Sequence, residues 1–249
     1  ASFEMLRRRC RYEPSICGGT SVLARYTLRF LTTDQFSRIS SLMVALEKVR
    51  KTYQVYGDEP FSVGMFVGDP TYNKVDDARE DLDKLFDSRD VRHKIIVSEC
   101  PNCGTDLLPP PNSDPDRDAY LMGPRISGST LQIFCTNRKC RFSQQALPLK
   151  ITDQDVLNNP PTFVLGTVDK FANLATKQQM VSLLGVNPGN GKAQRIPPSL
   201  IIQDELHLIS GPLGTITAVY EAAIDTVIRR GYEELGFQGM SAKYVAASA

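Results

Sequence analysis

Two adjacent carboxylates, Asp204 and Glu205, follow a short apolar run and are themselves followed closely by His207. A short apolar run that begins after prolines and ends at acidic residues predicts a buried parallel strand. The carboxyl ends of such strands form the ligand site of an open α/β sheet. One carboxylate there can hold Mg²⁺, and the second can orient or deprotonate a water that attacks a γ-phosphate. Alone, an Asp-Glu pair is more often a surface pair after a core strand, but His207 and the segments below favour catalysis.

Four of the six cysteines form two pairs, Cys100–Cys103 and Cys135–Cys140. A C-x2-C turn points two thiolates at one metal, and two such pairs close a tetrahedral zinc site with four cysteine ligands. Such a site is structural, because it leaves no open position for a substrate. The second pair has a four-residue gap, which is looser than the usual two, and four free buried cysteines are the alternative. We expect Cys10 and Cys17 to be free thiols.

Two further segments, Arg25–Gln35 and Gly166–Lys170, each follow a predicted strand. Both combine basic and hydroxyl side chains with the start of a helix, an arrangement that can cradle the phosphates of a nucleic-acid backbone. Taken singly, each segment is more often an ordinary capped βα loop.

The sequence contains no P-loop. Gly189–Lys192 is followed by Ala193 where Ser or Thr is required, and Gly185 is one residue too far from it. Ile16–Thr20 has paired glycines but no lysine. The chain therefore offers the magnesium and water part of an ATP site without the loop that holds the phosphates.

The composition is that of an ordinary globular protein, with 249 residues, 41% hydrophobic and 23% charged. This length accommodates one large core and an insertion. The net charge of +1 indicates no partner, so any nucleic-acid surface must be local. No apolar run approaches the roughly 20 residues of a membrane span, and no signal peptide precedes the first helix. Paired cysteines in such a chain indicate metal in a reducing compartment, so we expect a cytoplasmic protein with no membrane contact.

Apolar periodicity predicts an α/β fold: a mostly parallel sheet flanked by helices, with an inserted four-cysteine, zinc-ribbon-like module. We divide the chain into residues 1–93, a zinc-binding insertion at 94–148, and residues 149–249. The predicted strands are Val22–Phe30, Phe61–Val67, Thr162–Gly166, Ser199–Ile202 and Tyr244–Ala247. The predicted helices are Phe3–Arg9, Phe36–Lys51 with capping residues at Thr32–Gln35, Asn73–Asp87, Val168–Ala175 and Leu213–Arg230.

In this order, the segments resemble the first RecA-like domain of superfamily 2 helicases, and the resemblance covers nearly the whole chain. Its most specific parts, which are Arg25–Phe36, the four-cysteine insertion and Asp204–Thr215, resemble the helicases of the DISARM antiphage systems. The segments that resemble helicase motifs are Arg25–Gln35 (motif Ia), Gly166–Lys170 (motif Ic), Asp204–His207 (a DEAH-like Walker B box) and Ala247–Ala249 (the start of motif III).

The resemblance implies an ATP-dependent DNA helicase or translocase. Asp204 would coordinate Mg²⁺, Glu205 would activate water, and His207 would link the nucleotide state to motif III. Leu206 departs from the small residue common at its position. The residues implied to meet the DNA backbone, which fixes position without reading sequence, are Arg25, Thr27, Arg29, Gln35, Gly166 and Thr167.

The family also has a Walker A loop before the helix at Phe3 and a second RecA-like domain, and neither lies within these residues. We therefore expect an inactive fragment of a longer protein that uses structural Zn²⁺, ATP and Mg²⁺. By analogy with the family, a second defence-system protein is an expected partner. The alternative is a zinc-ribbon adaptor on an α/β scaffold that binds nucleic acid or protein without hydrolysis. Only the motor requires Asp204 and Glu205 at the carboxyl edge of the sheet.

Overall fold

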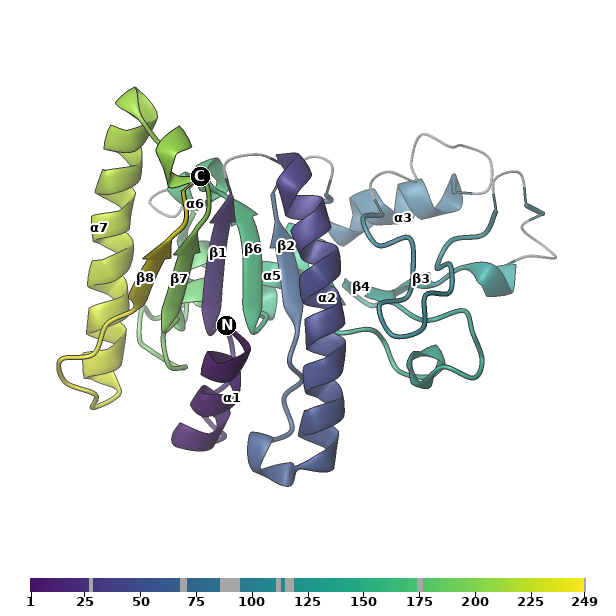
Figure 1. The fold of residues 1–249 in the computed structure, drawn as a ribbon, viewed down its shortest axis with the longest axis horizontal. Helices are drawn as coiled ribbons and strands as arrows, with labels where there is room; N and C mark the ends of the chain where they lie inside the picture. The colour runs from purple at the N-terminus through teal and green to yellow at the C-terminus, as the bar shows by residue number, and fades with distance from the viewer. Residues whose placement is uncertain are drawn as a thin grey trace.

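The computed structural model describes residues 1–26, 29–67, 71–85, 95–110, 113–114, 119–173 and 177–248. Its centre is a six-stranded sheet of order β5-β2-β6-β1-β7-β8, in which every neighbouring pair is parallel (Figure 1). The predicted parallel α/β sheet is therefore confirmed. The strands are β1 (Val22–Tyr26), β2 (Val63–Phe66), β5 (Leu149–Lys150), β6 (Phe163–Thr167), β7 (Leu200–Gln203) and β8 (Lys243–Ala246).

Helices cover both faces of the sheet (Figure 1). One apolar cluster joins α1 and α2 to the sheet, and a second joins α5, α6 and α7 to its other face. None of the helices in the described ranges is both long and apolar enough to cross a membrane. The helices are α1 (Ser2–Arg11), α2 (Arg29–Thr52), α3 (Val75–Asp83), α5 (Asp153–Asn158), α6 (Val168–Ala172) and α7 (Gly211–Glu234), with 3-10 turns η1 (Gln54–Tyr56), η3 (Ala119–Leu121), η4 (Arg141–Ser143), η6 (Gln178–Leu184) and η7 (Leu206–Leu208).

The boundary between the first strand and the following helix differs from the prediction. Within Val22–Phe30, predicted as a strand that leads into a loop, the strand ends at Tyr26, and α2 begins at Arg29 instead of Phe36. Thr32–Gln35 therefore lies inside the helix and does not cap it. A capping residue contributes about 1 kcal/mol, and the packing of a 24-residue helix on the sheet overrides that preference.

The cysteine-bearing part of the chain lies beyond β2 and α2, next to α3 (Figure 1). Its β3 (Pro124–Ser127) and β4 (Thr130–Ile133) form an antiparallel hairpin that contacts α3. Buried Leu107, Leu131 and Phe142 belong to the same apolar cluster as the core of β2. The insertion predicted at 94–148 thus shares a continuous core with the sheet.

Arg8 ties α1 to the loops that precede β1 and β7. Its guanidinium is 1% exposed and donates hydrogen bonds of 2.5 to 2.8 Å to the carbonyls of Cys17, Gly18, Ile196 and Pro197. Burial lowers the pKa of Arg8 to about 10, so the side chain stays charged at neutral pH. A single cation therefore satisfies four carbonyls that have little access to water.

We expect Arg8→Met to destabilise the chain by about 3 kcal/mol or more, because it leaves several buried carbonyls without donors. Urea denaturation followed by circular dichroism measures the change. Arg7→Met is the matched control, since Arg7 pairs with Glu4 at a partly exposed position and its loss costs roughly 0 to 1 kcal/mol. Equal effects of the two substitutions would contradict the role given to Arg8.

Candidate functional site

Asp204 and Glu205 directly follow β7, which lies between β1 and β8 inside the sheet. Backbone hydrogen bonds hold the segment from both sides. The Asp204 amide donates to the Arg25 carbonyl at 3.0 Å, and the Leu206 amide donates to the Ala247 carbonyl at 2.9 Å. The acidic pair is thus fixed at the carboxyl edge of the sheet, where the resemblance requires it.

Glu205 adopts a left-handed backbone conformation, with φ 50° and ψ 48°. Among the described residues it is the one non-glycine residue with positive φ. Such a conformation costs roughly 1 to 2 kcal/mol, and strain of this kind concentrates at functional sites. Its amide donates to the Asp204 carboxylate at 3.0 Å, which ties the two acids together.

His207 connects Glu205 to the last described residues. Its Nδ1 lies 3.3 Å from the Glu205 carboxylate and 3.1 Å from the Ser248 hydroxyl. Asp204 lies near Tyr26, since burial and then the negative charge of Asp204 raise the pKa of that phenol. The Tyr26 neighbour was not predicted as a site residue, because an apolar strand end carries no signal of its own.

The segments that resemble DNA-strand motifs reach the same edge. In the sheet register, Arg25 of β1 stands opposite both Gly166 of β6 and Gln203 of β7. Gln35 lies half-buried in α2. Thr27 and the side chain of Arg29 lie outside the described residues.

Arg25 is buried, at 2% exposure, and its Nη2 pairs with the Glu221 carboxylate of α7 at 2.6 Å. Side chains alternate along a strand, so Arg25 points to the α7 face while Tyr26 belongs to the opposite cluster. A contact between Arg25 and a DNA phosphate therefore requires the pair with Glu221 to open. Glu221 was missed in the sequence because its partner is 196 residues away.

Close packing around Gly166 leaves no room for a side chain at this position. A Cβ at this position would lie 2.7 Å from the Phe66 carbonyl and 2.8 Å from the Phe171 ring. The next residue, Thr167, is buried, and its hydroxyl has no hydrogen-bond partner within the part of the chain that the structure describes.

The four paired cysteines come together in one cluster. Their Sγ atoms all lie within 4.8 Å of one another, and those of Cys103 and Cys135 are 3.5 Å apart. A tetrahedral zinc with Zn–S bonds of about 2.3 Å separates its sulfur ligands by roughly 3.8 Å, so the cluster fits this ion. Gly104 supports the first turn with φ 72°, and the Asn102 amide donates to the Cys140 sulfur at 3.2 Å.

The thiols of the cluster differ in acidity. Burial raises the pKa of Cys103, but hydrogen bonds with Thr105 and the other thiols outweigh it and lower the value to about 6. Burial, with hydrogen bonds to neighbouring thiols, raises the pKa of Cys135. The thiolate form is thus favoured at Cys103 and disfavoured at Cys135. A bound cation would stabilise the thiolate form of all four cysteines.

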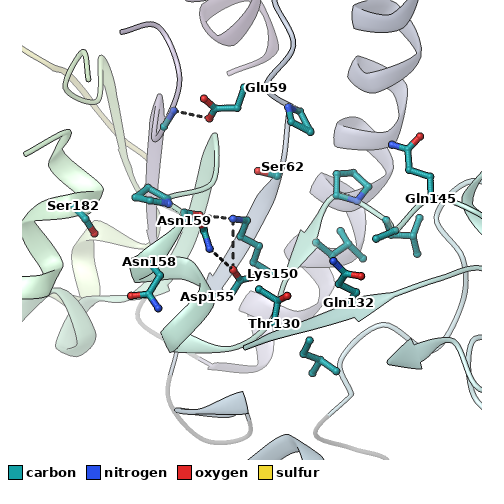
Figure 2. Close-up of a pocket in the computed structure, with 18 of the residues that line it drawn as sticks. Glu59, Ser62, Thr130, Gln132, Gln145, Lys150, Asp155, Asn158, Asn159 and Ser182 are labelled. Carbon is teal, nitrogen blue, oxygen red and sulfur yellow. Dashed lines mark hydrogen bonds and ion pairs between the residues drawn. The ribbon is translucent and has the colours of Figure 1, made fainter. Parts of the chain in front are cut away.

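A cavity of about 640 Å³ lies elsewhere (Figure 2). It opens at the amino ends of β2, β5 and β6, opposite the acidic edge, and β4 forms another wall. Its charges are already compensated. Lys150 lies 3.8 Å from Asp155 and donates to the Asn159 carbonyl, and Glu59 pairs with Arg195 at 2.8 Å. The cavity therefore does not extend the acidic site.

Fold and site together define a parallel α/β protein with an acidic pair at the sheet edge and a four-cysteine cluster. No family model matches the chain. The chain is 36% identical over 263 residues to the DISARM protein DrmA of Bacillus paralicheniformis (strain ATCC 9945a / NCIMB 11709 / CD-2). The alignment covers 93% of this chain and 23% of that protein, so the chain spans less than a quarter of its relative. This agrees with the resemblance to DISARM proteins, although the relative's name states no activity.

We expect the chain, purified without chelator, to contain about one zinc ion, and Cys100→Ser to remove most of it, because a three-sulfur site is incomplete. Elemental analysis by mass spectrometry measures this. Cys10→Ser is the control, since Cys10 lies outside the cluster. Protein without zinc, or zinc retained by Cys100→Ser, would contradict the site.

We expect Glu205→Asn to stabilise the chain by about 0.5 to 1 kcal/mol, because asparagine tolerates the left-handed conformation better than glutamate. Chemical denaturation measures the gain. Glu233→Asn in α7 serves as the control and should instead cost roughly 0.3 kcal/mol through lower helix propensity. A loss of stability at position 205 would show that its backbone strain is not relieved this way.

Proposed function

We propose that the chain is part of an ATP-dependent DNA helicase or translocase of an antiphage defence system. The main support is the acidic pair: Asp204 and a strained Glu205 end an inner parallel strand, beside the strand ends that carry Arg25 and Gly166. The 36% identity to a DISARM protein supports the defence role.

In this proposal, Asp204 holds Mg²⁺, which when bound neutralises the phosphates of ATP. Glu205 orients the attacking water and accepts its proton. His207, which contacts both Glu205 and Ser248, transmits the state of the nucleotide to the segment after β8. The oxygen donors of Asp204 and Glu205 suit this hard cation.

The DNA backbone is held without sequence readout at the same edge. The four cysteines hold structural Zn²⁺. The protein acts in the cytoplasm with a second defence-system protein as partner. The residues proposed to contact DNA are Arg25, Thr27, Arg29, Gln35, Gly166 and Thr167.

The second candidate is a zinc-ribbon adaptor that binds nucleic acid or protein without hydrolysis. The burial of Arg25 against Glu221 favours its protein-binding form, since the paired arginine is not free to meet a phosphate. ATP turnover by the protein that contains this chain separates the two candidates.

We expect no measurable ATPase activity from residues 1–249 alone, which lack a phosphate-binding loop. In the longer protein, Glu205→Gln should lower ATP turnover by roughly 10²-fold or more and leave ATP binding intact, because the amide keeps the shape and loses the base. Asp204→Ala should also weaken Mg²⁺-dependent ATP binding. Phosphate release and nucleotide titration measure these effects.

Glu233→Gln is the matched control, since it removes the same charge from the exposed end of α7. A Glu205→Gln protein that hydrolyses ATP at the normal rate would rule out the proposed site, whereas a longer protein without ATP turnover would leave the adaptor.

A further inference from the structure

A group of buried polar side chains lies under α7, at the carboxyl ends of β1 and β7. We call it the Arg25 cluster, and its members are Arg25, Gln203, Thr217, Tyr220 and Glu221. The three residues of α7 are three and four positions apart, so they share one face of the helix, and Glu221 pairs with Arg25. Arg25, Gln203, Thr217 and Tyr220 are each no more than 5% exposed.

Most polar atoms of the cluster have no partner. Within the described ranges, Arg25 Nε and Nη1, Gln203 Oε1, Thr217 Oγ1 and Tyr220 Oη are buried without a hydrogen bond. Burial raises the pKa of Tyr220, and the nearness of Thr217 and Arg25 opposes the rise, although neither reaches hydrogen-bond geometry. Buried polar groups in proteins are nearly always paired. Arg25 in particular keeps N–H groups at Nε and Nη1 that the Glu221 carboxylate does not satisfy.

Glu221 separates this surplus of donors from solvent. Its side chain is 32% exposed, while that of Arg25 is 2% exposed. Because Glu221 is the more exposed partner, rotation of its side chain toward solvent would break the pair without moving the strands. An oxyanion with several acceptor oxygens can then take up the N–H groups that one carboxylate leaves unused.

We propose that Glu221 is a gate on Arg25: its carboxylate holds the guanidinium until a phosphodiester group of a DNA strand displaces it. Glu221 is thus a positioning residue that sets the affinity for the DNA backbone, and Arg25 is its target. This inference rests on the proposed DNA-binding function and adds its regulation. It also explains how a buried arginine meets a phosphate.

The test measures binding of fluorescently labelled oligothymidylate to the chain by anisotropy over a series of salt concentrations. Glu221→Gln should bind about tenfold more tightly than the wild type, because the competing carboxylate charge is gone. The slope of log K against log salt should steepen by about 0.7, the value for one additional phosphate contact on a single strand.

Asp225→Asn is the matched control. It removes the same charge from the same helix one turn later, where Asp225 pairs with the 58%-exposed Arg229. Its affinity should change less than about twofold, since only long-range charge differs. Equal gains in Glu221→Gln and Asp225→Asn would overturn the gate and leave a general charge effect.

Glu221→Asp keeps the test decisive if Glu221→Gln folds poorly, which its melting temperature reveals, and variants of Arg25 test whether the gain acts through this residue. Glu221→Asp keeps the charge but shortens the side chain, and should give a smaller gain in affinity. Arg25→Met combined with Glu221→Gln should bind no more tightly than Arg25→Met alone. A full gain without Arg25 would overturn the inference.

The remaining outcomes separate this inference from the proposed function. If the wild type binds oligothymidylate in a salt-dependent way and Glu221→Gln binds it with the same affinity, the gate alone is overturned. No binding by either protein overturns DNA binding as well. A last comparison uses inorganic phosphate and oligothymidylate at matched ionic strength. If both raise the melting temperature of Glu221→Gln equally, the assignment to a nucleic-acid strand is overturned.

Discussion

The four hydrogen bonds of the Arg8 guanidinium are the interaction on which the geometry of the acidic edge depends. They join the loop before β1 to the loop before β7, and the first register pair of these strands, Val22 and Leu200, follows directly. Parallel strands have no hairpin turn to fix their register, so contacts between distant segments must do so. The same register brings the Arg25 carbonyl to the Asp204 amide at the opposite end.

Much of the fold could be read from apolar runs, because a strand buried on both faces and a long amphipathic helix both leave strong patterns. The register could not. Arg8 looks like a surface residue among the arginines of α1, and nothing local indicates its four acceptors. The sequence also hid β5, since two residues are too few for a pattern, and it misplaced the start of α2, where capping chemistry lost to packing.

In the candidate site, too, some features could be predicted from the sequence and others could not. The acids at 204 and 205 are adjacent in sequence, and so nearly are the two members of each cysteine pair, and this spacing predicted that each set lies together. The partner of Arg25 depends on which face of β1 its side chain occupies and on where α7 crosses that face. Neither can be derived from the segment Arg25–Gln35 itself. A basic residue at a strand end thus predicted a phosphate contact where the structure holds an ion pair.

Arg25 contacts both the α7 face of the sheet and the acidic pair. Its side chain reaches Glu221 on the α7 face, while its carbonyl accepts the amide of Asp204, the first acid of the site. Coupling between distant groups requires an element with two arrangements that both sites bias. In the gate proposed above, the Glu221 carboxylate, on or off Arg25, would be such an element, and it lies one residue and one backbone hydrogen bond from Asp204.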